Sequence, residues 1–549
     1  MRSVILLGCA ALYLLLAWPA LQKPLMIDET VFAMDAAAAR YGQFGMWHPP
    51  FYFDLLRGLY HLGGLRDQAL RVLGVVGVLL NFLLAARLCR QVAHEEQIPN
   101  MTPWVWLGMA THPLLVQGST ILDIDTTILP SLILLFLVTF LLRATQPTLP
   151  WLVGIAGCFF LNLWAKMTTS LALPVSVGLW YALQRQWRLG FRVTVWLVVI
   201  GGGLFLGAWW WYAHAFDLPY GAVFGRTVGA FTSEFYRTWL PPVVALLNRC
   251  VRVGLWIGPF TLALFGLGLW SRLAVWKSRR NLKTLDLCWL VATILLVGYC
   301  LIGGTMFGFA KYHVPWVPLA AVCVASAAAR MSRPRLITLA VACVAVGLTV
   351  GVGFDPLYWW NYRVRLAAIL EPSRAPALVW QLVGFLGLYA MLMALVVRLE
   401  RSRPIVQRWM IATLVSAIVW NVGLAWQQRY APYSTTYIYG RNVTEMRQLA
   451  GRLTQVAAQR PGSSLVAPED VLFIAGLPWS EYPSHRVKEL DGFLAALRDP
   501  RVAAIVTSPV WNEGRFFREV FDDPQVRRLL DTHFIATPLG LSTVWLRRD

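Results

Sequence analysis

Acidic side chains are scarce in the apolar part of this sequence, and two pairs of them stand directly beside apolar runs. The first pair is Asp28 and Glu29, and the second is Asp123 and Asp125. A carboxylate next to a substrate hydroxyl can accept its proton as that hydroxyl attacks an electrophilic carbon. Carboxylates at the edge of a membrane are costly unless they are paired, solvated or used. These four residues are the candidate catalytic carboxylates of the chain.

Each acidic pair also has a structural interpretation. Asp28 and Glu29 suit the first turn of an interfacial helix, where the helix dipole favours negative charge. Asp123 and Asp125 suit a polar turn between two helices. However, no lysine or arginine occurs from 111 to 128, so the second pair needs a distant cationic partner or an open polar cavity. We favour a functional role for at least one of these two aspartates.

Lysine is rare in this chain, with six residues against 42 arginines. Lys166 and Lys311 both lie in short connections between apolar runs, and Tyr312 and His313 follow the second of them. A compact ammonium group is a good point-charge ligand for phosphate. The alternative for either lysine alone is snorkelling to lipid headgroups. On the same face as the carboxylates, the two lysines together indicate an anion site.

The elements that position these residues are apolar helices. The chain has 549 residues, of which 58% are hydrophobic and 14% charged. Its mean hydropathy of +0.57 excludes a soluble enzyme, a disordered chain and a fibrous protein. We predict an all-α polytopic membrane protein with about thirteen transmembrane helices, at about 4–20, 70–88, 102–119, 126–142, 150–165, 170–184, 193–213, 253–270, 287–304, 314–329, 336–353, 378–398 and 409–427.

The formal net charge of +20 predicts the orientation of these helices. With a cytoplasmic N-terminus, the cytoplasmic connections hold 19 basic and four acidic residues, and the opposite connections hold 14 basic and 11 acidic residues. The positive-inside rule favours this orientation. The candidate carboxylates and lysines then face outward, and the C-terminus lies outside. The charge is therefore mainly a signal of topology and does not indicate nucleic-acid binding.

The last part of the chain has a different composition. Residues 429–549 hold 15 basic and 13 acidic residues and no run long enough to cross a bilayer. Strand-like runs at 464–467, 502–507 and 542–546 alternate with helix-like runs at 442–459, 492–498 and 514–530. We predict a transmembrane catalytic domain at 1–428 and a small extracytoplasmic α/β domain at 429–549.

Metal-binding patterns are missing from the sequence. The eight cysteines are scattered singly, and none pair at C-x-x-C spacing. This distribution indicates neither a thiolate zinc site nor a disulfide framework. No histidine cluster accompanies the candidate carboxylates, so we predict no metal site.

The ordered set of these features resembles a known superfamily. An Asp-Glu pair follows the first span, HPPFY occupies 48–52 in the same outer loop, an aspartate opens the fourth span, and KYHVPWVP occupies 311–318. Together they resemble the GT-C membrane glycosyltransferases, and among these the bacterial relatives of protein O-mannosyltransferases and of lipid A aminoarabinose transferase. The resemblance covers the membrane part, about 1–427.

The resemblance implies a role for each candidate residue. Asp28 would be the catalytic base or would orient the acceptor, with Glu29 supporting it, and Asp125, or else Asp123, would be the second acidic residue of the site. Lys311, Tyr312 and Lys166 would hold the lipid phosphate, and His313 would also bind substrate. His48 would line the pocket at the position where close relatives of the aminoarabinose enzyme carry a lysine.

The implied activity is an inverting transfer of sugar from a polyprenyl-phosphate donor to a hydroxyl or phosphate of a lipid, glycan or protein. It would take place on the outer face of a bacterial cytoplasmic membrane. A departing polyprenyl phosphate is already an anion, so it needs positive charge and no general acid. Some GT-C enzymes use a divalent metal and the mannosyltransferase branch does not require one; we predict no essential metal or other cofactor.

The expected partners are the polyprenyl-phosphate-sugar donor, a glycan, lipid or protein acceptor and membrane lipids, without nucleic acid. Two alternatives belong to other classes of protein. A transporter or flippase of lipid-linked sugars would use the same polar residues to line a pathway, but no internal repeat is visible. A sensor of a periplasmic ligand would need a cytoplasmic output domain, which the sequence does not indicate.

Overall fold

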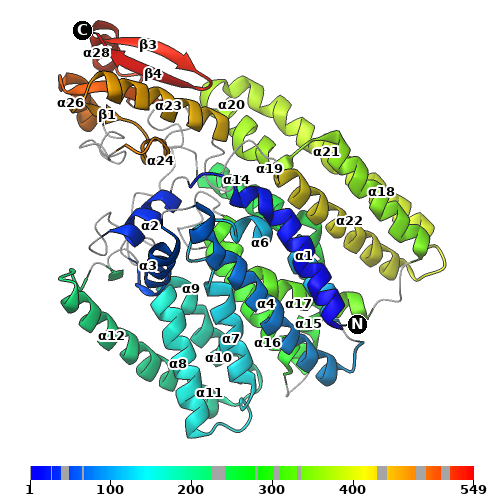
Figure 1. Cartoon of the computed structure of the whole chain (residues 1–549). Coiled ribbons are helices and arrows are strands. Elements are labelled where there is room, and N and C mark those ends of the chain that lie inside the picture. Colours follow the sequence, from blue (N-terminus) through cyan, green and yellow to red (C-terminus); the bar gives the residue numbers. More distant parts are fainter. Residues whose placement is uncertain are drawn as a thin grey trace. The chain divides into compact units, whose positions relative to one another are not determined.

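The computed structural model, drawn in Figure 1, describes most of the chain. The chain forms two compact units. The first unit consists of Met1–Leu21, Phe32–Asp355 and Phe385–Tyr430, and the second of Gln22–Val31, Pro356–Gly384 and Ala431–Asp549. The residues described are 2–25, 28–38, 48–64, 67–99, 101–221, 223–224, 242–278, 282–301, 310–330, 335–429, 442–477, 490–508 and 520–548.

The described part of the first unit is built from helices. Two helices, α2 (Asp28–Ala37) and α21 (Ala375–Leu399), begin in the second unit and continue into the first. The helices that lie wholly in the first unit are α1 (Arg2–Leu21), α3 (Phe51–Gly63), α4 (Asp67–Glu96), α5 (Thr102–Thr111), α6 (Pro113–Gly118), α7 (Leu129–Leu141), α8 (Leu149–Ala165), α9 (Met167–Ser170), α10 (Ala172–Leu183), α11 (Trp187–Trp196), η1 (Leu197–Gly201), α12 (Gly202–Ala215), α14 (Pro242–Ile257), α15 (Pro259–Ser278), α16 (Thr284–Leu301), η4 (Ala310–His313), α17 (Trp316–Ala329), α18 (Leu336–Val352) and α22 (Ile405–Gln428).

The length and composition of these helices identify a multi-pass membrane protein. Among the described residues, five helices are long and apolar enough to cross a membrane, or six if one bent pair is counted as a span. Six shorter apolar helices of 10–17 residues accompany them. The predicted helical membrane fold is confirmed, whereas the domain boundary at 428 and the count of about thirteen spans stay predictions.

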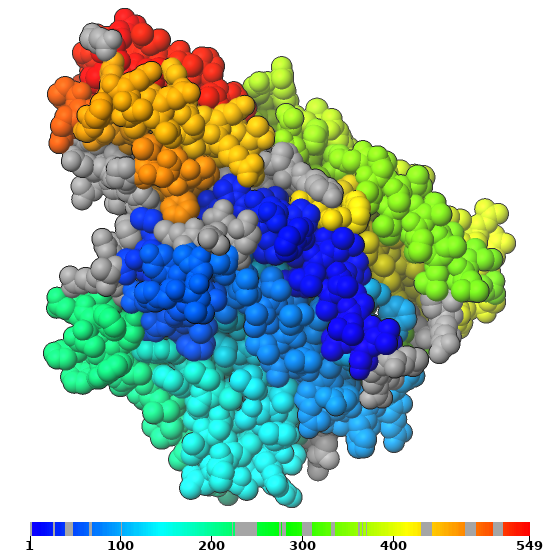
Figure 2. Space-filling model, viewed as in Figure 1, coloured from blue at the N-terminus to red at the C-terminus, as the bar shows by residue number. Residues whose placement is uncertain are grey.

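Large apolar side chains are exposed on the surface of the first unit. Helix α1, dark blue in Figure 2, lies along the surface of this unit and exposes the side chains of Leu7, Leu15 and Trp18. Its opposite side buries Tyr13 and Leu16. A helix that is apolar on both its exposed and its buried side is expected where the outer solvent is the hydrocarbon of a bilayer.

Two predicted spans are broken helices. The span at 102–119 is interrupted at His112, whose backbone is extended because Pro113 follows it. The span at 253–270 is wrong as a single straight helix, because α14 and α15 meet at 91°. Gly258 makes this bend at a φ of +90°, a region that side chains with a Cβ rarely adopt. Hydropathy alone does not detect either break, because both halves are apolar.

The predicted cytoplasmic end of the first unit is held by ion pairs between four helices. Arg272 of α15 contacts Glu96 at the end of α4 and Asp286 of α16, each at 3.3 Å. Arg330, which follows α17, also pairs with Glu96. The Glu95 carboxylate accepts hydrogen bonds at 2.7 Å from the backbone N–H and the hydroxyl of Thr284 at the start of α16. The Glu95 carboxylate thus satisfies a backbone N–H at the start of α16 that has no partner within its own helix.

The second unit contains a four-stranded sheet with helices on both faces. The strands are β1 (Ser464–Val466), β2 (Val502–Thr507), β3 (Phe534–Leu539) and β4 (Ser542–Arg547), in the order β1-β2-β4-β3. Strands β1 and β2 are parallel and the other neighbours are antiparallel. The helices of this unit are α19 (Pro356–Tyr358), η5 (Trp359–Val364), α20 (Arg365–Leu370), η6 (Pro372–Arg374), α23 (Val443–Gln459), α24 (Glu469–Ile474), α26 (Leu490–Arg498) and α28 (Pro524–His533).

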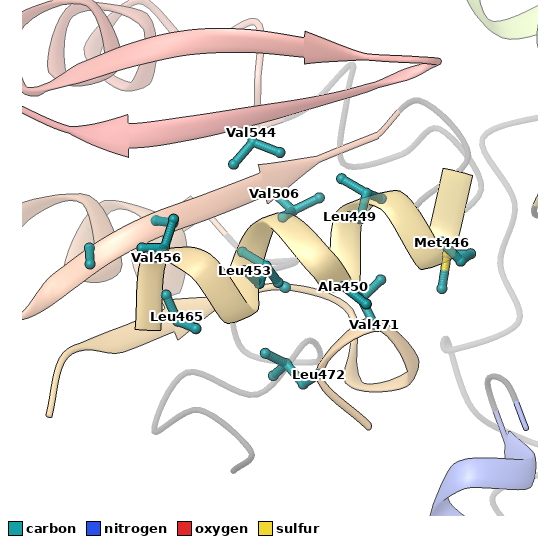
Figure 3. Close-up of a cluster of buried hydrophobic side chains, with 13 residues drawn as sticks. Met446, Leu449, Ala450, Leu453, Val456, Leu465, Val471, Leu472, Val506 and Val544 are labelled. Carbon is teal, nitrogen blue, oxygen red and sulfur yellow. The ribbon is translucent and has the colours of Figure 1, made fainter. Parts of the chain in front are cut away.

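Two apolar cores stabilise this sheet. Figure 3 shows Leu449 and Leu453 of α23 packed among Val506 of β2, Val544 of β4 and Val471 of α24. The other core lies between the sheet and helices α26 and α28, which contribute side chains such as Phe493 and Leu530. Every residue of β2 is buried, as expected of a central strand covered on both faces.

Three strands and two helices of the predicted α/β domain are confirmed to within two residues. The helix expected at 514–530 is partly wrong: 514–519 lie outside the described residues, and α28 begins at Pro524. Asp523 caps this helix by accepting hydrogen bonds from the N–H groups of Gln525 and Val526. Strand β3 was not predicted, because it is a mostly exposed edge strand that contains Pro538.

Candidate functional site

Asp123 and Asp125 lie in a fully buried turn between α6 and α7, at residues 119–128. The Asp123 carboxylate accepts a hydrogen bond of 2.9 Å from the backbone N–H of Asp125. The hydroxyl of Thr127 donates to the Asp123 carbonyl oxygen at 2.9 Å. Short polar side chains of this kind form hydrogen bonds with backbone groups of a turn that have no partner in a helix or sheet. The DIDTT segment therefore folds as a self-bonded turn inside the first unit.

Helix α4 presses closely against this turn because it carries glycine at two contact positions. A Cβ on Gly74 would stand 1.9 Å from the Ser119 carbonyl oxygen, and one on Gly77 would stand 2.3 Å from that of Thr127. Ser131, in the first turn of α7, donates a hydrogen bond of 3.0 Å to the Gly77 carbonyl. Because glycine has no side chain, the backbone of α4 can pack directly against the backbone of the turn.

Each aspartate of the turn pairs with a lysine that is distant in the sequence. Lys311, in the short helix η4, donates to Asp123 Oδ2 at 2.6 Å. Lys166, at the break between α8 and α9, pairs with Asp125 Oδ2. Of the two alternatives that the sequence left open, a distant cationic partner and an open polar cavity, the structure therefore contains the distant partners. We call Asp123, Asp125, Lys166, Lys311 and Tyr312 the ion-pair cluster.

Tyr312 joins the two ion pairs. Its ring centroid lies 4.6 Å from Lys166 Nζ and 5.6 Å from Lys311 Nζ. An ammonium group within about 6 Å of an aromatic ring is attracted by the ring quadrupole. Tyr312 therefore helps to hold two like charges in one small region.

The two carboxyl groups of the ion-pair cluster have different electrostatic surroundings. Burial raises the pKa of Asp123, but the charges of Lys311 and Lys166 outweigh it, so the pKa is lowered overall. Burial also raises the pKa of Asp125, and with the repulsion of Asp123 it outweighs the attraction of Lys166, which brings the pKa to about 6. Asp125 Oδ1 is buried and has no hydrogen-bond partner among the described residues. Asp125 is thus the carboxyl group of the pair that is ready to take a proton.

His313 follows the ion-pair cluster in the sequence and is fully buried. Burial lowers its pKa to about 4, so the imidazole is neutral at neutral pH. A neutral imidazole cannot supply charge to an anion, although it can donate one hydrogen bond. Its predicted place in substrate binding stays a prediction.

The other predicted site residues lie apart from this cluster in the sequence. Asp28 and Glu29 open α2 in its acidic first turn, as the structural interpretation of this pair expects, and Glu29 is buried. They belong to the part of α2 in the second unit, so their catalytic roles stay predictions. His48 lies beside Phe32, with 6.5 Å between the ring centroids.

The structure adds two buried arginines that the sequence reasoning did not single out. Arg71 of α4 donates to the carbonyl oxygens of Ala20 and Leu21 at 3.3 and 3.4 Å, at the end of α1. Arg252 is buried on α14, which packs against η4 and α6. Both lie at the edge of an apolar run. Their burial distinguishes them from the many interfacial arginines of the chain, and the sequence pattern does not show this burial.

A comparison over the whole chain finds the same overall fold in solved structures of ArnT, in agreement with the fold that the resemblance predicted. A matching crystal structure is that of ArnT from Cupriavidus metallidurans bound to undecaprenyl phosphate, with a TM-score of 0.57 and 14% identity over 99% of this chain and 97% of that one. The apo ArnT structure from the same organism matches with a TM-score of 0.54 and 15% identity over the same shares. No protein-family model and no curated protein matches the sequence.

Proposed function

We propose that this chain is a glycosyltransferase that takes a sugar from a polyprenyl-phosphate donor on the outer face of a bacterial cytoplasmic membrane. The observation that carries the proposal is the ion-pair cluster, in which the buried Lys311 and the mostly buried Lys166 lie beside two carboxylates in a GT-C fold. The matched ArnT structure is bound to undecaprenyl phosphate, which supports a polyprenyl-phosphate ligand for this fold. The acceptor is a hydroxyl or phosphate group of a lipid, glycan or protein.

The proposed chemistry assigns the lysines to the leaving group. As the acceptor oxygen attacks the anomeric carbon, the bond from that carbon to the phosphate oxygen breaks, and its electron pair stays on the phosphate. Lys311 and Lys166 stabilise the growing negative charge, and Tyr312 and His313 complete the phosphate site. Positive charge is more effective in a buried site than in water, because the local dielectric constant is lower.

The proposed base is a carboxylate, and Asp28 is our candidate, with Glu29 supporting it. It accepts the proton that the acceptor hydroxyl loses during attack. His48 lines the acceptor or sugar pocket in this proposal. Attack from the face opposite the phosphate inverts the anomeric centre. The reaction requires no metal at any of these steps.

The test is a transfer assay with the purified full-length protein in lipid nanodiscs and a panel of synthetic undecaprenyl-phosphate sugars. We expect transfer by the wild type and a loss of roughly 10²–10⁴-fold in Asp28→Asn, the usual contribution of a general base. Glu371→Gln is the matched control, because Glu371 is an exposed carboxylate paired with Arg374. This variant should keep the wild-type rate.

The possible outcomes separate the parts of this proposal. Undiminished transfer by Asp28→Asn excludes Asp28 as the base but leaves the transferase assignment in place. Translocation of the donor across a proteoliposome membrane without a new glycosidic bond would contradict the transferase and favour a flippase.

A further inference from the structure

The ion-pair cluster has no net charge as it stands. The formal charges of the two aspartates and the two lysines cancel, and all four side chains are largely buried. Asp123 uses both carboxylate oxygens, because Oδ1 accepts from the Asp125 N–H and Oδ2 accepts from Lys311. Asp125 uses only Oδ2, toward Lys166, and its buried Oδ1 has no hydrogen-bond partner in the described part of the chain.

A lipid phosphate that enters this cluster brings excess negative charge. A polyprenyl-phosphate sugar is a phosphodiester with a single negative charge, whereas free polyprenyl phosphate is a monoester with a second pKa near 6 and a charge of roughly −1.5 to −2 at pH 7. An uncompensated charge in a buried site is costly. To bind the phosphate, Lys166 must also either break its ion pair with Asp125 or contact the carboxylate and the phosphate at the same time.

We propose that Asp125 takes up a proton when a lipid phosphate binds at Lys166 and Lys311, and that this proton determines which charge state of the phosphate the site retains. The inference rests on the proposed function, because it assumes a lipid phosphate as the ligand. The proton comes from solvent and binds the free Oδ1, and the resulting O–H can donate to a phosphate oxygen. No bond of the lipid is made or broken, and the proton returns to solvent when the lipid leaves.

The surrounding charges favour Asp125 over its neighbours as the proton acceptor. Burial and the nearby Asp123 raise its pKa to about 6, against the attraction of Lys166. Asp123 remains ionised, because Lys311 and Lys166 lower its pKa despite burial. His313 has a pKa lowered by burial to about 4, so it does not titrate between pH 5.5 and 8. Among the described residues, the elements packed against the turn and η4 also carry the buried charged side chains Arg71 of α4, Arg252 of α14 and Asp286 of α16.

The sign of the pH dependence follows from linkage. A bound phosphate adds negative charge and raises the pKa of Asp125 further, so the complex holds more protons than the free protein. Affinity for the phosphate must therefore rise as the pH falls toward 6. The product monoester carries more charge than the donor at neutral pH, so an ionised Asp125 speeds its departure.

The experiment measures binding of the monomethyl ester of undecaprenyl phosphate to the full-length protein in nanodiscs from pH 5.5 to 7.5. This diester keeps a single negative charge over that range, so any pH dependence comes from the protein. We expect about tenfold tighter binding at pH 5.5 than at pH 7.5 for the wild type. Calorimetry at pH 7 in two buffers of different ionisation enthalpy should show proton uptake on binding.

Two variants assign the proton to one carboxyl group. Asp125→Asn should bind with an affinity that does not change with pH, and without proton uptake. Asp123→Asn, which removes the neighbouring carboxylate, should keep a pH-dependent affinity. If a variant does not fold, the proton count of the wild type still decides whether a proton is taken up.

Each result bears on one of the two proposals. Binding by the wild type with no pH dependence and no proton uptake overturns the role of Asp125. Equal pH dependence in Asp125→Asn and the wild type overturns it as well. No binding of the diester at any pH would instead contradict the proposed function.

Discussion

At the scale of single residues, the candidate site depends on two ion pairs that join distant parts of the sequence. Lys311 and Asp123 are 188 residues apart, and Lys166 and Asp125 are 41 apart. A buried ion pair adds little net stability compared with an apolar replacement, but removing one partner leaves an uncompensated charge. Removing one partner of a pair and removing both therefore have different effects on stability, and the comparison distinguishes a structural role of the lysines from a role in binding the phosphate.

We predict that Lys311→Met destabilises the protein by roughly 3–5 kcal/mol, because Asp123 is left buried and ionised. The double variant Lys311→Met/Asp123→Asn should recover most of the stability, since neither charge remains. Transfer should stay reduced by about 10²–10³-fold in the double variant, because the cation for the leaving phosphate is missing. Thermal unfolding in detergent and the transfer assay measure the two effects separately. A stable double variant with the wild-type rate would exclude Lys311 from the phosphate site.

At the scale of elements, the turn that carries the aspartates is positioned by the close approach of α4. Gly74 and Gly77 are one turn apart on α4 and meet the backbone at the two ends of this turn, at Ser119 and Thr127. Tyr13 of α1 adds a side-chain hydrogen bond of 2.7 Å to Ser119. The two carboxylates are therefore held by a backbone-to-backbone contact rather than by their lysine partners alone.

We predict that Gly77→Ala displaces the turn and lowers both stability and transfer, because its Cβ would meet a backbone carbonyl that cannot rotate away. The expected loss of stability is about 1–3 kcal/mol, the usual cost of overpacking. The matched control is Gly157→Ala on α8, where a Cβ meets nothing within 4 Å. Alanine is the better helix former at that position, so the control should be neutral or slightly stabilising. Unchanged stability and transfer in Gly77→Ala would contradict the described contact.

At the scale of the whole molecule, the distribution of charge along the sequence predicts the orientation of the chain in the membrane. Acidic residues on the predicted cytoplasmic side are bound to basic residues of neighbouring helices, as in the contacts of Glu96 with Arg272 and Arg330. Basic residues still outnumber acidic ones on that side, and this excess is the signal that the positive-inside rule uses.

We predict that alkaline phosphatase fused after residue 549 is active in a bacterial host, and that a green fluorescent protein at the same place is dark. A fusion after residue 280, in a predicted cytoplasmic connection, should show the reverse. Enzyme activity and fluorescence of whole cells measure both. The opposite pattern at either fusion site would refute the predicted orientation.

The sequence predicts most elements correctly, and its failures have local physical reasons. The α17 span and strand β2 were predicted to within two residues, because each is a continuous apolar run bounded by polar or turn residues. The bend at Gly258 and strand β3 were not predicted. A bend inside an apolar run does not change hydropathy, and an exposed edge strand lacks the alternating apolar pattern.

The sequence by itself indicated a helical membrane protein and named the side chains from which its chemistry would be built. It also indicated that Asp123 and Asp125 need a distant cationic partner or an open polar cavity, because the cost of an unpaired charge in an apolar setting can be seen from the neighbouring residues alone. Only the tertiary structure decided that the partners are Lys311 and Lys166, that both ammonium groups lie within about 6 Å of the Tyr312 ring, and that one oxygen of Asp125 has no hydrogen-bond partner among the described residues. Burial and pairing are properties of segments that meet in space, and no local pattern specifies which distant segments will meet.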